Sequence, residues 1–365
     1  MRGDRVIRRS RRAVLSALGL AWLLTSCSSL PQPVAQHVAP SQPGLQRPPA
    51  SPSAPLGHAG FLLPGAGAGL PALAPGVPFI GHLLIAESSS HSRILEIDPS
   101  GAVTWALTTT APPLGRPLGP PDDAFYTVDG SAIVANSEEG QEAMAVNRLT
   151  GAVIWQAGSL FRRGGDLTQL NNPDDAVPAA DGSVWLADIR NCRILHLDGS
   201  TGAVMTVLGG HGCAHNPPRQ FSEPNGAFPT AGGSLVVTEI SGSRVTWLNA
   251  DGTVRWSHRV PVGYPSDAMA YPDGSVLLTD YSSVGSVLRV GADGTVLWRY
   301  SPRGAAQLDH PSIAIPLASN RVAICDDYDN RIVIVDPTTS TVVWQWTGDA
   351  THRLLRPDGL DYRPS

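Results

Sequence analysis

The chain has 365 residues, with 26 basic and 31 acidic side chains and a formal net charge of −5 at pH 7. All the basic residues are Arg, and residues 1–26 hold six of them together with one Asp. The remainder therefore carries 20 Arg against 30 acids, a net charge of about −10. This excess of negative charge argues against a nucleic-acid partner.

Residues 1–26 have the features of an export signal. An Arg-rich segment precedes an apolar run at 13–25, which is too short to span a bilayer as a helix. Ser10-Arg11-Arg12 resembles the twin-arginine export pattern, and export by either the twin-arginine or the general secretory route stays open. The residues up to Cys27 resemble a bacterial lipobox, in which the signal is cut before the Cys and its thiol is lipidated. We expect Cys27 to anchor the protein to the outer side of a bacterial membrane; the alternative is an ordinary signal peptide.

Residues 27–78 are rich in Pro, Ala, Ser, Gly and Gln, with no acidic residue and one basic residue, Arg47. Such a segment cannot bury enough apolar surface to order itself, and its prolines keep it extended. We expect a disordered tether between the anchor and a folded domain at 79–365.

The folded domain is predicted from a repeat. Residues 172–207 contain four short β-type runs separated by Gly, Asp and Asn bends, which is typical of an antiparallel meander. A Pro followed three residues later by Ala, or once by Leu, opens six copies: Pro121, Pro173, Pro224, Pro265, Pro311 and Pro357. A Val followed two residues later by Trp closes five copies, and Val204 with Thr206 closes the other. A period of about 40–50 residues with four strands predicts propeller blades.

The openers and closers are offset along the chain. The first closer, Val103, precedes the first opener, Pro121, and no strands follow the last opener, Pro357. The tail 356–365 should therefore supply the inner strand of the blade formed by residues 82–107. The sequence predicts an all-β, six-bladed β-propeller of four-stranded antiparallel blades, closed by the C-terminal strand, which leaves no free edge at the seam.

Two cysteines are expected to pair. Cys192 lies in the bend between the second and third strands of its blade, and Cys213 lies in the long exit loop of the same blade. Both positions belong to the same face, and an exported protein meets oxidising conditions, so a disulfide is predicted. Two free thiols are the alternative. Cys325 ends an apolar strand and is expected to be a buried thiol.

Two families resemble these repeats. DGSVWLADIRNCRILHLD (181–198) and DDYDNRIVIVDP (326–337) resemble NHL repeats, and TGAVIWQ (150–156) and DGTVLWR (293–299) are similar to the Trp motif of PQQ-like quinoprotein propellers. The resemblance covers about residues 80–365 and implies the fold. It implies little about activity, because such propellers include binding modules and enzymes, among them peptidyl-hydroxyglycine lyases and arylsulfotransferases. The base-plus-Arg set that would hold PQQ has no match, so PQQ is not expected.

Polar residues end the second strand of each blade: Glu87, Asn136, Asp188, Glu239, Asp280 and Asp326. In four blades an Arg follows five or six residues later: Arg93, Arg193, Arg244 and Arg331. Repetition in successive blades favours a structural role, in which the acids accept backbone N–H bonds of the bend and pair with the Arg.

The residues around the opening Pro should ring the mouth of the central channel. The position before the Pro changes from blade to blade, and we expect ligand contacts there from Asn172, Glu223, Tyr264, His310 and Arg356. Acids crowd the positions after it, and a metal site is expected at Asp123, Asp175, Asp267 and Asp358. Three outcomes are open for these carboxylates: proton uptake, capping of backbone amides, or binding of Ca²⁺.

Two functions from different classes are compatible with this pattern. The first is a membrane-tethered extracytoplasmic module that binds a protein, glycan or small-molecule ligand at the channel mouth. The alternative is a metal-assisted extracytoplasmic hydrolase, lyase or transferase at the same face, with His310 as the acid/base residue.

Overall fold

The computed structural model describes residues 73, 76–108 and 119–364, all of which belong to the compact unit Ser53–Ser365. The predicted signal peptide, Cys27 and almost all of the predicted tether lie outside the described residues. Within the described part of the chain, no helix is long and apolar enough to cross a membrane.

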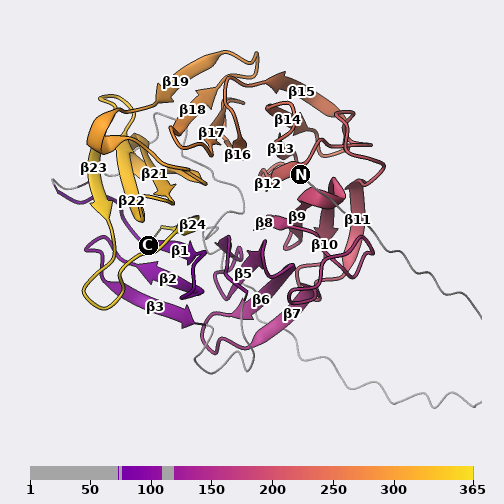
Figure 1. Cartoon of the computed structure of the whole chain (residues 1–365), viewed down its shortest axis with the longest axis horizontal. Helices are drawn as coiled ribbons and strands as arrows, with labels where there is room; N and C mark the ends of the chain where they lie inside the picture. Colours follow the sequence, from indigo (N-terminus) through magenta and orange to yellow (C-terminus); the bar gives the residue numbers. More distant parts are fainter. Residues whose placement is uncertain (1–72, 74–75, 109–118, 365) are drawn as a thin grey trace, which may run out of the picture. The chain divides into compact units, whose positions relative to one another are not determined.

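The strands form six four-stranded antiparallel sheets, which confirms the predicted blades (Figure 1). Blade 1 contains β24 (Pro357–Arg363), β1 (His82–Glu87), β2 (Arg93–Ile97) and β3 (Val103–Thr108). Blade 2 contains β4 (Ala124–Tyr126), β5 (Ala132–Ser137), β6 (Glu142–Asn147) and β7 (Val153–Gly158). Blade 3 contains β8 (Pro173–Pro178), β9 (Val184–Asp188), β10 (Arg193–Leu197) and β11 (Val204–Gly209).

The second half of the ring repeats this order. Blade 4 contains β12 (Pro224–Pro229), β13 (Leu235–Glu239), β14 (Arg244–Leu248) and β15 (Val254–Arg259). Blade 5 contains β16 (Pro265–Ala270), β17 (Val276–Asp280), β18 (Ser286–Val290) and β19 (Val296–Tyr300). Blade 6 contains β20 (Ala314–Leu317), β21 (Arg321–Asp326), β22 (Arg331–Asp336) and β23 (Thr341–Trp346). Three short 3₁₀ helices lie in the connections: η1 (Ile189–Asn191), η2 (Gly304–Ala306) and η3 (Ala318–Asn320).

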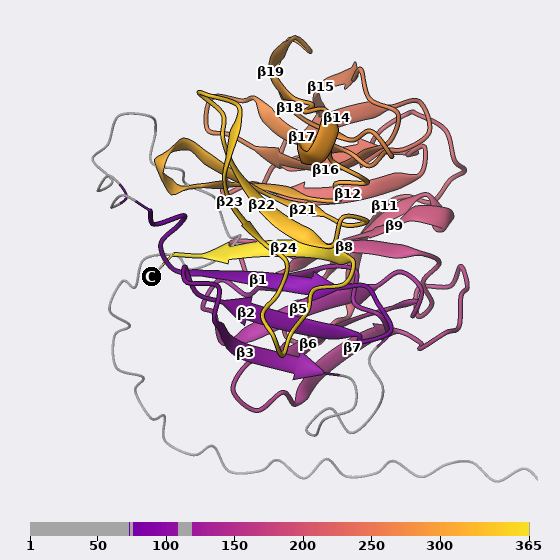
Figure 2. The same ribbon diagram turned by 60° about the vertical axis from the view of Figure 1, so that its left-hand side comes forward.

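The C-terminal strand closes the ring. β24 pairs antiparallel with β1, with Leu360 opposite Ile85 and Tyr362 opposite Leu83, as the offset of the repeats predicts (Figure 2). Leu360 and Tyr362 are buried there. This pairing satisfies the backbone groups of β1 that would otherwise form an exposed sheet edge.

A buried carboxylate strengthens the same seam. Glu96 of β2 is 1 % exposed and accepts hydrogen bonds from Tyr126 Oη at 2.7 Å and from Arg148 Nη2 at 2.6 Å, both in blade 2. Arg363 of β24 lies 3.4 Å from the same carboxylate. Glu96 therefore connects its own blade, including the closing strand, to blade 2. The repeat pattern does not identify it, because no other blade has an acid at this position of its third strand.

The Trp residues near the end of five repeats lie in the outermost strands, and two of them show how they connect neighbouring blades. Trp105 Nε1 donates to Arg148 O in the next blade at 2.9 Å, and Trp155 Nε1 donates to Gly199 O at 2.8 Å. Large aromatic side chains fill the space between blades that diverge outward, and their N–H groups need such acceptors. The Trp motif therefore packs neighbouring blades against each other.

Apolar side chains of the innermost strands fill the channel below its mouth. The residue after the repeated Ala belongs to one buried cluster in five blades: Phe125, Val177, Phe228, Met269 and Ile315. Phe125 and Phe228 come from non-adjacent blades, and their ring centroids are 6.1 Å apart. The channel mouth therefore has an apolar floor.

The predicted disulfide is present. Cys192 and Cys213 are joined with their Cα atoms 5.2 Å apart, at a sequence separation of 21. The bond ties the bend after β9 to the exit loop after β11. The third described cysteine, Cys325, is fully buried, as expected.

Candidate functional site

Carboxyl groups from five blades converge at the mouth of the channel. A small cavity of about 60 Å³ is lined there by Asp122, Asp123, Glu138, Asp174, Asp267 and Asp358. Asp175 and Asp327 interact electrostatically with this set. We call these eight carboxyl groups the mouth cluster.

The backbone at the start of the inner strands explains why the acids meet. The pairing of β8 with β9 changes register between Asp174 and Val177, and Asp175 has a left-handed φ of 48°. The same shift follows Pro224 in β12 and Pro265 in β16. A bulge of this kind re-aims side chains relative to a regular strand. Two successive acids of one strand can therefore both belong to the cluster.

Three of the four carboxylates predicted to bind metal lie together. Asp123, Asp175 and Asp267 each offer an oxygen, and these oxygens lie within 4.8 Å of one another. Asp122, Asp123 and Asp174 form a second such group. The fourth predicted residue, Asp358, is outside both trios and lies within hydrogen-bonding reach of Asp122.

Asp175 is the most unusual member of the cluster. It is 0 % exposed, and neither carboxylate oxygen has a hydrogen-bond donor as a partner among the described residues. Asp175 and Asp267 lie close enough for a hydrogen bond, which two ionised carboxylates cannot form without a shared proton. A buried carboxylate without a donor is costly, so this site requires a proton or a cation.

Burial and mutual repulsion hold protons on the cluster. Burial, followed by the charge of Asp123, raises the pKa of Asp122 to about 6, and burial raises the pKa of Asp123 to about 6. Burial and the charge of Asp122 raise the pKa of Glu138 to about 7. Burial also raises the pKa of the remaining five carboxyls well above the ordinary value: Asp174, Asp175, Asp267, Asp327 and Asp358.

Two members of the cluster were not predicted from the sequence. Glu138 follows the end of β5 and accepts a hydrogen bond from Asn172 Nδ2 at 2.7 Å. Asp327 follows the end of β21 and accepts hydrogen bonds from Ser312 Oγ at 3.0 Å and Tyr281 Oη at 3.2 Å. Both come from bends between the second and third strands. The adjacent acids Asp326 and Asp327 were the available signal for the second of them.

The five residues predicted to contact a ligand are not equivalent. Four have left-handed backbones, with φ of 57°, 57°, 56° and 48° for Asn172, Glu223, His310 and Arg356. This conformation is uncommon for residues other than Gly, and it often occurs at binding sites. Tyr264 lines the cavity and donates from Oη to Asn225 Oδ1 at 2.8 Å.

The other four residues do not line the cavity itself, and each has different partners. Asn172 contacts the mouth cluster through Glu138, whereas Glu223 pairs with Arg190. His310 Nδ1 lies 2.7 Å from Asp309 Oδ1, and the His310 ring is 4.4 Å from the Tyr328 ring centroid. The guanidinium of Arg356 lies 5.5 Å from the centroid of the same Tyr328 ring. His310 and Arg356 therefore share one aromatic surface beside the cavity.

The acids that end the second strands have the structural role expected for them. Glu87, Asp188 and Asp326 pair with Arg93, Arg193 and Arg331 at 2.6, 2.7 and 2.7 Å. Asp188 also accepts the backbone N–H of Asn171, and Asp326 accepts that of Asp309. Glu239 differs, because its partner is His215 Nδ1 at 2.8 Å, from the exit loop of the preceding blade, in place of the expected Arg244.

Comparison with known proteins agrees with the fold. Residues 214–355 match the family model described as outer membrane protein assembly factor BamB. None of the curated protein sequences matches the chain.

Solved structures show the same architecture at low sequence identity. A crystal structure of a protein of unknown function from Bacteroides caccae aligns with a TM-score of 0.56 at 16% identity, covering 78% of this chain and 99% of that one. A chain of a nidogen/laminin complex aligns with a TM-score of 0.54 at 15% identity, covering 76% of this chain and 97% of that one. Together with the six blades, these likenesses show that the chain has the six-bladed β-propeller fold, and residues 214–355 are similar to the PQQ-like repeats of the BamB family model.

Proposed function

We propose that this protein is a binding module whose channel mouth takes up a divalent cation and binds its ligand at the surrounding rim. The proposal rests on Asp175, which is buried and has no hydrogen-bond donor among the described residues. Its carboxylate lies in the same trio as those of Asp123 and Asp267. The positive charges that act on the cluster come from Arg190 and Arg356, which are too few to offset eight carboxyl groups.

Calcium fits these residues better than the other common ions. Ca²⁺ takes six to eight oxygen ligands in flexible geometry, and carboxylates are its preferred charged ligands. Mg²⁺ demands a compact octahedral arrangement and gives up its water reluctantly. Asp123, Asp175 and Asp267 would supply the charged oxygens, and water in the cavity would complete the shell.

The ligand would contact the rim, because a cavity of about 60 Å³ admits only an ion and water. Beside the cavity lie the Tyr264 and Tyr281 rings, with centroids 5.5 Å apart, and then His310 and Arg356 around Tyr328. Aromatic faces with hydrogen-bonding groups suit a glycan, a small molecule or an exposed segment of a protein. A bound cation would lower the negative potential that these ligands meet.

Titration calorimetry of the full chain, purified in detergent and treated with a chelator, tests the proposal. We expect one saturable Ca²⁺ site with a Kd between about 10⁻⁶ and 10⁻³ M, and weaker binding of Mg²⁺. Asp267→Asn should weaken Ca²⁺ binding at least tenfold. The control Asp251→Asn changes an exposed turn acid and should leave the affinity unchanged. Absence of saturable binding, or equal affinity in the Asp267→Asn variant, would overturn the proposal.

A metal-assisted hydrolase, lyase or transferase is the second candidate, and one observation favours it. His310 has a carboxylate partner in Asp309, and its ring is 4.9 Å from that of Tyr281, which lines the cavity. A paired His can move a proton to or from a substrate. This candidate requires that His310→Gln abolish turnover while leaving Ca²⁺ binding intact, and retained turnover in that variant would exclude His310.

We further propose that the propeller is exported and held at the outer side of a bacterial membrane through lipidated Cys27. The support is the sequence, in which an Arg-rich segment, a short apolar run and a Cys are followed by a Pro-rich stretch. The native protein should partition into the detergent phase, and Cys27→Ala should move it to the aqueous phase. Equal partitioning of the two forms would contradict lipidation.

A further inference from the structure

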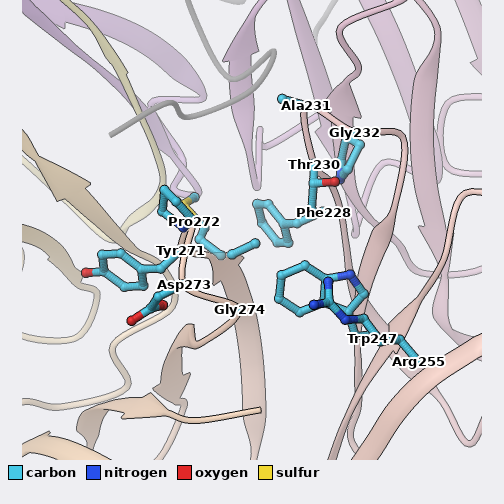
Figure 3. A pocket seen from close by; sticks show the side chains of 13 residues that line it. Phe228, Thr230, Ala231, Gly232, Trp247, Arg255, Tyr271, Pro272, Asp273 and Gly274 are labelled. Atoms are coloured by element: carbon cyan, nitrogen blue, oxygen red, sulfur yellow. The ribbon is translucent and has the colours of Figure 1, made fainter. Parts of the chain in front are cut away.

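A second cavity lies between blades 4 and 5, at the opposite ends of β12 and β16 from the mouth cluster. Its volume is about 260 Å³, close to the lower end of the roughly 300–1,000 Å³ typical of small-molecule pockets. The turns after β12 and β16 form part of its wall, and Phe228, Met269 and Trp247 supply apolar surface. Figure 3 shows the Phe228, Trp247 and Tyr271 rings around this space, with the guanidinium of Arg255 beside Trp247.

The blade repeat is broken at this cavity. In blades 2, 3 and 5 the turn after the inner strand contains Asp-Gly-Ser, and the Asp accepts the backbone N–H of the Ser at 3.0–3.1 Å: Asp129, Asp181 and Asp273. Blade 4 has Gly232 at the equivalent position, before Gly233 and Ser234. There Ser234 N donates to Thr230 Oγ1 at 3.2 Å instead. The turn of blade 4 therefore keeps its shape while it lacks the carboxylate.

Two polar groups that line this cavity, the Arg255 guanidinium and the Trp247 indole N–H, have no acceptor among the described residues. In blade 5, Asp273 pairs with Arg289 at 2.6 Å, and Arg289 stacks over Tyr271 at 4.3 Å. In blade 4, Arg255 stacks over Trp247 at 5.0 Å, but no carboxylate among the described residues pairs with it. Trp247 is 4 % exposed, and its buried indole Nε1 has no hydrogen-bond partner there either.

We infer that this cavity binds a small aromatic carboxylate. The ligand's carboxylate would meet Arg255, which lines the cavity, since a guanidinium binds a planar carboxylate through two parallel hydrogen bonds. Its ring would pack against Trp247 and Phe228, where aromatic pairs add to the apolar burial. Charge complementarity and aromatic walls thus specify the same class of ligand.

The test uses 3-phenylpropionate as the probe and its uncharged amide as the matched control, with saturation-transfer NMR on the full chain. We expect the acid to bind and the amide to bind at least tenfold more weakly. Gly232→Asp restores the residue of the other blades, and a Cβ at Gly232 meets only Thr230 Oγ1, at 4.0 Å. This variant should fold normally and lose at least tenfold in affinity, because it adds a negative charge to the wall of the cavity that repels the ligand's carboxylate.

Further variants make the outcome decisive. Arg255→Gln should weaken binding at least tenfold, and Trp247→Phe, which keeps a ring but removes the N–H, should weaken it severalfold. Asp267→Asn at the mouth cluster should leave probe binding unchanged, so failure here is distinguishable from failure of the cation proposal. Equal binding of acid and amide, or full affinity in both Gly232→Asp and Arg255→Gln, would overturn the inference.

Discussion

Replacing Asp175 with Asn should raise the melting temperature of the metal-free chain at pH 8 and abolish the stabilisation that Ca²⁺ gives the native protein. The native carboxyl is fully buried without a donor and needs either a proton or a cation, whereas the new amide needs neither and can donate to the carboxylates of Asp123 and Asp267. Removal of an uncompensated buried charge is worth on the order of 3 kcal/mol, which corresponds to a rise of several degrees.

The size of this effect should depend on pH. The folded-state pKa values of the mouth cluster are raised, so the folded protein holds more protons than the unfolded chain. The stability contributed by these protons is present below the ordinary carboxyl pKa of about 4. It is lost as the pH rises through about 6 for Asp122 and Asp123 and about 7 for Glu138. The Asp175→Asn variant should therefore gain more over the native chain at pH 8 than at pH 5.

Thermal unfolding followed by calorimetry, with chelator or with excess Ca²⁺ at each pH, measures both effects. Asp251→Asn removes an exposed charge and should change neither the melting temperature nor the response to Ca²⁺. An Asp175→Asn variant that is less stable than the native chain at both pH values without metal would show that the carboxylate has stabilising partners.

Removing the C-terminal strand should have the largest effect on the fold. A chain that ends at Arg356 lacks β24, which leaves the edge of β1 unpaired and exposes the surface that Leu360 and Tyr362 cover. It also loses Arg363 from the carboxylate of Glu96. Loss of buried apolar side chains costs roughly 2–5 kcal/mol each, which approaches the whole stability of a typical domain. We expect no cooperative thermal transition and recovery mainly as aggregates.

A permuted chain provides the matched control. Residues 355–364 placed before residue 79 through a short linker restore the same pairing, because Arg363 lies opposite His82 at the start of β1. This permutant should melt cooperatively near the native temperature. Native-like melting of the truncated chain would mean that β24 does not hold the ring closed.

The repeat made the architecture predictable, whereas the site was predictable only in part. The position of Asp123, Asp175 and Asp267 follows from the opening Pro, because each occupies the same place in its blade. Glu138 and Asp327 do not follow, since they come from bends whose other copies lack an acid at the channel. The repeat period predicts where equivalent residues of the inner strands lie. It does not predict which residues from other segments meet them, because those contacts form only in the folded ring.

Partnerships between side chains were harder to predict than positions. The Arg-acid spacing correctly predicted the pair of Asp188 with Arg193, but the same spacing failed for Glu239, because His215 reaches it from a loop without repeat. The missing hydrogen-bond donor to Asp175 likewise could not be predicted, because it depends on the positions of all the neighbouring side chains in the folded protein. By contrast, the loss of Asp at Gly232 is visible in the aligned repeats, and it marks the second cavity.

We expect either protons or a cation to neutralise the mouth cluster. The most direct test is to count the protons released when Ca²⁺ is added to the metal-free chain in weak buffer. At pH 6, near the raised pKa values of Asp122 and Asp123, a cation must displace protons from the carboxyls that it binds. We expect the native chain to release at least about one proton per Ca²⁺ bound, and the Asp267→Asn variant to release none at the same Ca²⁺ concentration. Saturable Ca²⁺ binding without proton release at pH 6, or the same release from that variant, would contradict this expectation.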